Sequence, residues 1–148
     1  MNLPSNFKYK SVLITGGTGF LGKNIVPILQ ANGVDVTATG RNYDLTSLEK
    51  AQELFTLKDY DLIIHGAAFQ GAGDFTLKYP ADQFFKNNLI HTNTFECWKR
   101  HQPKAKMVGI GSTCSYPGNL PVLSEEDWSS SSICRNLWFD KVQHATRN

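Results

Sequence analysis

Cysteine is scarce in this chain, and its spacing shows no metal or disulfide pattern. The 148 residues contain three cysteines, Cys97, Cys114 and Cys134, and no two of them form a CxxC pair. An odd number of unpaired cysteines argues against a disulfide framework and against a zinc site. We therefore expect the protein to work in a reducing compartment, the cytoplasm.

An excess of one charge and a long apolar run are also lacking. Fifteen Lys and Arg against thirteen Asp and Glu give +2, without a basic stripe. This balance argues against nucleic acid or an acidic membrane as a partner. No apolar run approaches the roughly 18 residues of a bilayer span, and the first residues do not resemble a secretory signal. The composition, 41% hydrophobic, predicts one globular domain over residues 1–148.

Short β-branched runs alternate with longer segments of helical periodicity. The short runs predict strands over residues 11–15, 34–38, 61–65 and 107–111. The periodic segments predict helices over residues 20–31, 46–56, 80–101 and 137–146. In the second helix, Thr46 and Glu49 have the spacing of a capping box. Strands separated by helices predict a doubly wound α/β fold, a parallel sheet with helices on both faces.

A glycine-rich loop connects the first predicted strand to the first predicted helix. It consists of Gly16, Gly17, Thr18, Gly19, Phe20, Leu21 and Gly22. In this position Gly16 permits the tight turn, Gly19 lets a diphosphate approach the backbone, and Gly22 lets the helix pack closely. Free N–H groups at the helix start then bind the phosphates. The alternative is that the loop is only a tight connection between strand and helix and binds no ligand.

Four segments together resemble the extended short-chain dehydrogenase/reductase family, whose members include NAD(P)-dependent sugar-nucleotide epimerases, dehydratases and reductases. The segments are the glycine loop TGGTGFLG, residues 64–68 (IHGAA), residues 87–97 (NNLIHTNTFEC) and residues 109–117 (GIGSTCSYP). The last is most similar to the GDP-fucose synthase branch. The resemblance implies a Rossmann-type sheet, a nucleotide-sugar substrate and cofactor contacts at Ala67, Ala68 and Asn87. For Asn87 an ordinary helix-surface position is the alternative.

The end of the second predicted strand bears on the choice between NADP and NAD. An acidic residue about 20 residues after the glycines usually holds the ribose 2′-hydroxyl of NAD, but here the strand ends in Thr39-Gly40-Arg41. Arg41 is either the partner of a 2′-phosphate, which favours NADP, or a solvated loop cation. Asp44 and Leu45 resemble the family's adenine-contacting pair. Asp44 is also close enough to the glycine loop to contact the ribose.

The resemblance supplies a catalytic set that this sequence matches incompletely. Ser112, four residues before Tyr116, matches the serine that polarises the substrate oxygen, and Cys114 matches an acid/base cysteine of fucose synthases. Lys141 matches the lysine that binds the nicotinamide ribose. Leu137 then stands where the family has its proton-transferring tyrosine, and leucine cannot be titrated.

The resemblance implies a substrate-binding second half, for which we expect no counterpart in this sequence. We expect the cofactor-binding part of such an enzyme, slow or inactive by itself. The alternatives are a non-catalytic dinucleotide-binding module, completed by a second copy or another chain, and an inactive truncated remnant.

Histidine and aromatic residues complete the predictions. For His65, at the end of the third strand, a cofactor-facing position and a hydrogen-bonded strand end are both open. His91 and His101 have no acidic companion and are not expected to bind metal. The aromatic residues of the long helix are expected to form its packed face: Phe84, Phe85, Phe95 and Trp98.

Overall fold

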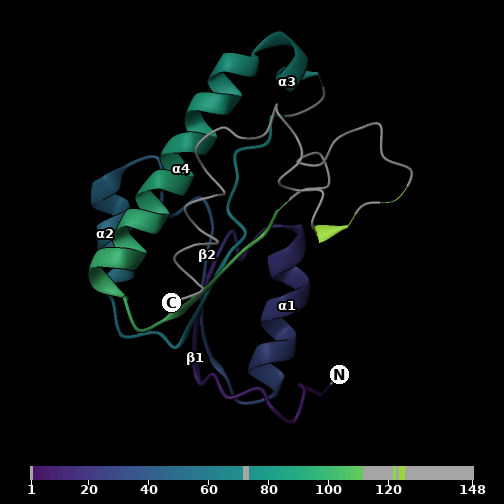
Figure 1. The fold of residues 1–148 in the computed structure, drawn as a ribbon, viewed down its shortest axis with the longest axis vertical. Helices are drawn as coiled ribbons and strands as arrows, with labels where there is room; N and C mark the ends of the chain where they lie inside the picture. The colour runs from purple at the N-terminus through teal and green to yellow at the C-terminus, as the bar shows by residue number, and fades with distance from the viewer. Residues whose placement is uncertain (1, 72–73, 112–121, 123, 126–148) are drawn as a thin grey trace. The chain divides into compact units, whose positions relative to one another are not determined.

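The structure, a computed structural model, describes residues 2–71, 74–111, 122 and 124–125 (Figure 1). The chain divides into two compact units, residues 1–110 and residues 111–148. The fold below is that of the first unit. The predicted helix 137–146 lies outside the described residues, as do Ser112, Cys114, Leu137 and Lys141.

Along the described residues of the first unit, strands alternate with helices as the periodicity predicts, except that two helices lie between the last two strands. The strands are β1 (Ser11–Thr15), β2 (Asp35–Thr39), β3 (Leu62–His65) and β4 (Lys106–Gly109). The helices are α1 (Phe20–Ala31), α2 (Leu48–Phe55), α3 (Phe75–Lys78) and α4 (Pro80–His101). Each predicted element in this part of the chain is confirmed, with ends displaced by up to two residues. The short helix α3 has no counterpart in the prediction.

The four strands form one parallel sheet in the order β2-β1-β3-β4. In register, Thr15 lies beside Thr39 on β2 and beside His65 on β3. The carboxyl ends of all strands therefore share one edge, and the connections that follow them meet there.

Each face of the sheet packs against its own helices. Along β1, Val12 and Ile14 point to the face that α1 covers, where Leu29 is buried. Leu13 points to the opposite face, into a larger core formed with α2 and α4. Alternation along single strands thus places helices on both faces, as expected for a Rossmann-type, doubly wound sheet. Within the described residues, no helix is both long enough and apolar enough to cross a bilayer.

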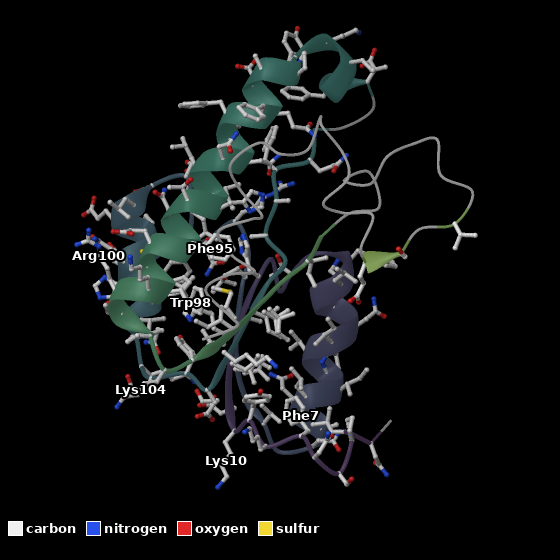
Figure 2. All side chains as sticks on the ribbon, in the orientation of Figure 1. Phe7, Lys10, Phe95, Trp98, Arg100 and Lys104 are labelled. Carbon is white, nitrogen blue, oxygen red and sulfur yellow. The ribbon has the colours of Figure 1, made fainter. Side chains whose placement is uncertain are left out.

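The aromatic residues of α4 divide into two pairs, so their prediction is half wrong. Phe95 and Trp98 are partly buried against the larger core, with Trp98 Nε1 donating to the Ala105 carbonyl at 2.8 Å (Figure 2). Phe84 and Phe85, however, are 72% and 62% exposed. At 1.5 Å per residue the 22-residue helix is about 33 Å long. A strand of four or five residues reaches only about half as far, so the first half of α4 extends past the sheet.

The N-terminus of α2 also differs from its prediction. The N-cap is Ser47, whose Oγ accepts a hydrogen bond from Lys50 N at 3.3 Å. Thr46 is not the cap, because its Oγ1 donates to the carboxylate of Asp44 at 2.7 Å. The aspartate side chain thus competes for the threonine hydroxyl, and the helix starts one residue later.

Candidate functional site

The loop after β1 is shaped by Gly16. Its φ of +72° lies in the left-handed region, which favours glycine. A Cβ at this position would lie 2.7 Å from the Gly66 carbonyl oxygen and 2.8 Å from Ala67 N. The glycine therefore permits both the turn and the close approach of the segment that follows β3.

The start of α1 is packed against the same loop. A Cβ on Gly22 would lie 2.2 Å from the Gly17 carbonyl oxygen, and a Cβ on Gly17 would lie 2.7 Å from Ala38 Cβ on β2. Both positions exclude any side chain. Backbone therefore packs directly on backbone where the helix leaves the sheet.

Gly19, by contrast, is exposed at the N-terminus of α1. It is the N-cap residue with φ −80° and ψ −172°, and no side chain caps the helix. No acidic residue lies in the first turn. Thr18, Gly19, Phe20 and Leu21 are exposed, and a Cβ on Gly19 would meet only the Gly16 carbonyl oxygen, at 3.1 Å. The uncapped N–H groups and the positive end of the helix dipole can therefore bind an anion.

The residues after β2 lie next to this loop. A Cβ on Gly40 would lie 2.1 Å from Thr18 Oγ1, so the two turns are in contact. Arg41 is exposed. Asp44 is also exposed, and its carboxylate accepts hydrogen bonds from Thr46 N and Oγ1, which lower its pKa. Leu45 is a core residue, 5% exposed.

Asn87, on α4, fixes the segment that follows β3. Its Oδ1 accepts from Phe69 N at 2.8 Å, and its Nδ2 donates to the carbonyls of Phe69 and Gln83 at 2.9 and 3.0 Å. All of these contacts are to backbone. In this segment Ala67 is half-buried and Ala68 is exposed. Asn87 is therefore a bridging residue rather than an ordinary surface asparagine of the helix.

His65 ends β3 inside the protein, 4% exposed. Its Nδ1 lies 2.7 Å from Thr15 Oγ1, and its Nε2 lies 2.8 Å from His91 Nδ1 on α4. The hydrogen-bonded alternative for His65 is thereby confirmed. Burial, and to a smaller extent the charge of His91, lower the pKa of His65 to about 3. The sequence does not predict that His91 is the hydrogen-bond partner of His65, since a contact between residues 26 positions apart has no local pattern.

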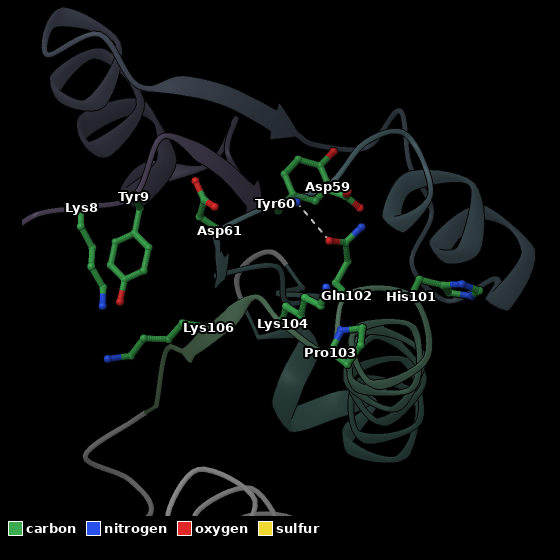
Figure 3. Close-up of a pocket in the computed structure, with 10 residues that line it drawn as sticks. All are labelled: Lys8, Tyr9, Asp59, Tyr60, Asp61, His101, Gln102, Pro103, Lys104 and Lys106. Atoms are coloured by element: carbon green, nitrogen blue, oxygen red, sulfur yellow. Dashed lines mark hydrogen bonds between the residues drawn. The ribbon is translucent and has the colours of Figure 1, made fainter.

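A second feature lies at the other edge of the sheet. An open cavity of about 780 Å³ is lined by residues at the amino ends of β1, β3 and β4, among them Tyr9 and Asp61 before their strands and Lys106 at the start of β4 (Figure 3). One wall is fixed by Gln102, which is buried and accepts a hydrogen bond from Tyr60 N at 3.0 Å. Doubly wound sheets bind ligands at the carboxyl ends of their strands. The glycine loop lies at that edge, and this cavity lies at the amino ends.

Comparison with known proteins agrees with the geometry of the loop. A model of the NAD dependent epimerase/dehydratase family matches residues 12–137. The chain belongs to this family. Among its relatives, a probable GDP-L-fucose synthase of Drosophila melanogaster is 31% identical over 112 residues, which cover 73% of this chain and 35% of the relative. A bifunctional UDP-glucose and UDP-xylose 4-epimerase of Pisum sativum is 27% identical, covering 78% of this chain and 41% of the relative.

Two solved structures share the fold of this chain. A GDP-L-fucose synthetase from Naegleria fowleri superposes with a TM-score of 0.70 at 23% identity, covering 88% of this chain and 39% of that one. A dTDP-4-dehydrorhamnose reductase from Bacillus anthracis, solved in complex with NADP, superposes with a TM-score of 0.67 at 25% identity, covering 79% and 41%. This epimerase-family chain thus spans 35% to 41% of the length of the proteins compared.

Proposed function

We propose that this chain is the dinucleotide-binding part of an NAD(P)-dependent nucleotide-sugar epimerase or reductase. The observation that carries the proposal is the uncapped N-terminus of α1, which follows the left-handed turn at Gly16 and has no acidic residue in its first turn. A diphosphate at this point accepts hydrogen bonds from backbone N–H groups and interacts favourably with the helix dipole.

Each predicted site residue then has a role in binding. Residues 16–22 hold the diphosphate. Asp44 accepts from the adenosine end of the dinucleotide, and the backbone around Leu45 lies against the adenine. Ala67 and Ala68 line the pocket, and Asn87 holds their segment in place through Phe69. The bound nicotinamide would supply hydride transfer to or from a sugar carbon.

The catalytic roles are proposed from the family pattern. Ser112 polarises the sugar oxygen, Cys114 moves a proton during epimerisation, and Lys141 holds the nicotinamide ribose. Leu137, at the tyrosine position, leaves the proton transfer at the sugar oxygen without a donor. For that reason a second function is also proposed, that of a non-catalytic dinucleotide-binding module. Measurable reduction of a nucleotide sugar by this chain alone would contradict the second function and support the first.

Gly19→Asp tests whether α1 binds the diphosphate. The extended backbone at Gly19 suits an aspartate N-cap, so the folded state is expected to keep its stability. The added carboxylate faces the phosphates, and NADPH affinity should fall more than tenfold. Thermal unfolding and calorimetric titration measure the two quantities. At about one hundred times its Kd, NADPH should stabilise the wild type by roughly 2.7 kcal/mol. If NADPH and NADH both leave the wild-type midpoint unchanged, the proposed function is wrong.

Arg41→Ala tests the proposed preference for NADP. Arg41 is exposed beside the loop, and the carboxylate of Asp44, three residues further along the chain, is bonded to Thr46. A guanidinium on the 2′-phosphate contributes about 1.5–3 kcal/mol as a charge-assisted contact. The variant should therefore bind NADPH about 10- to 150-fold more weakly and NADH with unchanged affinity. Arg100→Ala on α4 is the control, with an exposed arginine paired to Glu96. Equal weakening of both nucleotides by Arg41→Ala would contradict the assignment.

A further inference from the structure

Three side chains form a hydrogen-bonded row from the proposed cofactor edge to α4. Ala67 N lies 3.3 Å from Thr15 Oγ1, Thr15 Oγ1 lies 2.7 Å from His65 Nδ1, and His65 Nε2 lies 2.8 Å from His91 Nδ1. The two imidazole rings are perpendicular, with centroids 5.1 Å apart. The row thus connects a backbone N–H beside the glycine loop to His91 on α4, a residue to which the proposed binding role assigns no part.

The proton positions along the row follow from what each atom can donate. Thr15 is fully buried, and its Oγ1 accepts from Ala67 N–H. Within the described part of the chain, His65 Nδ1 is the one acceptor in reach of the threonine hydroxyl, which would otherwise be buried without a partner. Thr15 therefore donates to His65 Nδ1. The His65 proton is then on Nε2 and is donated to His91 Nδ1, which leaves the His91 proton on Nε2.

This arrangement holds only while both rings are neutral. A proton added to His91 Nδ1 would face the His65 Nε2–H at 2.8 Å, and the two would repel. A proton added to His65 Nδ1 would force the Thr15 hydroxyl to rotate and accept, which leaves its buried proton without an acceptor. Protonation of either imidazole therefore disrupts the hydrogen-bonded row.

The surroundings also disfavour a charge on either imidazole. Burial lowers the pKa of His91 as well as that of His65. Among the described residues, no carboxylate, ammonium or guanidinium contributes to either shift. Several charged side chains of the neighbouring elements are bound elsewhere: Glu96 to Arg100, Glu53 to Lys50, Asp74 to Lys78, Asp44 to Thr46, and Lys86 over the Phe69 ring.

We infer that His91 is a positioning residue of the dinucleotide site, which acts through His65 and Thr15 on the Ala67 backbone and loses its hold when either imidazole takes up a proton. The inference rests on the proposed function, because Ala67 matters only if a dinucleotide binds there. Gly16 explains why dinucleotide binding would depend on the position of Ala67. The backbone of Gly66 and Ala67 lies so close to Gly16 that a Cβ would not fit between them, so a shift of this segment displaces the glycine loop.

The test is the pH dependence of NADPH affinity in the full chain, measured by calorimetric titration between pH 7.5 and 5.5. In His91→Asn, Oδ1 takes the place of Nδ1 as an acceptor that does not titrate. In His91→Leu no acceptor remains. His101→Asn, on the last residue of α4 and outside the row, is the matched control. All four proteins use the same ligand, so the titration of the nucleotide phosphates cancels in the ratios.

Wild type and His101→Asn should lose more affinity than His91→Asn as the pH falls to 5.5, by less than about tenfold, because burial lowers the pKa of His91 from its ordinary value of 6.5. At pH 7.5, His91→Asn should bind like wild type and His91→Leu about tenfold more weakly. Imidazole ¹⁵N spectra should show both His65 and His91 with the proton on Nε2.

Two results would overturn the inference, and they are distinguishable. If wild type binds NADPH and His91→Asn has the same pH profile, His91 does not position the site, whereas the proposed function stands. If no dinucleotide binds at any pH, the proposed function is wrong and the inference is wrong with it.

Discussion

Helices α1 and α2 both begin at the carboxyl edge of the sheet, but their N-termini are built in opposite ways. At α2, Ser47 accepts a hydrogen bond from Lys50 N, and Glu49 places a negative charge in the first turn. At α1, the N-cap is Gly19, and both the side-chain cap and the acidic residue are missing. At the N-terminus of α2, the side chains of Ser47 and Glu49 thus supply a hydrogen-bond acceptor and a negative charge. At the N-terminus of α1, no side chain supplies either.

The difference shows how a binding position can be told from an ordinary helix start. A glycine N-cap such as Gly19 costs stability, about a few tenths of a kcal/mol relative to a good cap. At α1 this cost accompanies three further glycines that admit close backbone contact, at positions 16, 17 and 22. A ligand that binds with its own negative charge would recover the lost interactions. Separate substitutions at the starts of α1 and α2 test this difference.

Gly22→Ala should have the largest effect. Its Cβ would lie 2.2–2.3 Å from the Gly17 backbone, which cannot move without separating α1 from β1. Overpacking of this kind costs about 3 kcal/mol or more, because backbone rather than a flexible side chain is displaced. Chemical denaturation should show the loss, and NADPH should no longer stabilise the protein. A variant as stable as wild type would show that the helix start is not packed as described.

Ser47→Ala should have a smaller effect, confined to stability. Removal of the cap leaves Lys50 N without its side-chain acceptor and costs about 0.5–1 kcal/mol, at the low end because the hydrogen bond is 3.3 Å long. The stabilisation by NADPH should be unchanged, since the ligand is proposed to bind at α1. A loss of NADPH affinity without a loss of stability would reverse the proposed roles of the two helix starts.

The features predicted correctly from the sequence were those with local causes. The turn at Gly16 and the close packing at Gly22 follow from residue type within seven positions. The strands follow from short β-branched runs, with ends shifted because Val34 is buried like a strand residue although β2 begins at Asp35. The α2 cap was misplaced by one residue, since nothing in the pattern shows that Asp44 binds the Thr46 hydroxyl.

Features that depend on distant parts of the chain were missed. Periodicity assigns Phe84 and Phe85 to a packed face, but it contains no information on how far the sheet extends beneath α4. Likewise, His91 was considered only as a metal ligand with His101. Among the described residues no group of three metal-binding side chains occurs, and the partner of His91 is instead an imidazole on β3.

The order of strands in the sheet has a consequence for synthesis on the ribosome. β1 is central, but its partner β3 lies far along the chain, with Thr15 beside His65 at a separation of 50 residues. At about 5–20 residues per second, the second partner of β1 is synthesised roughly 3–10 s after β1 itself. During this interval the central strand has at most β2 beside it. The apolar residues Val12, Leu13 and Ile14 are then a point at which nascent chains can associate with one another or with chaperones.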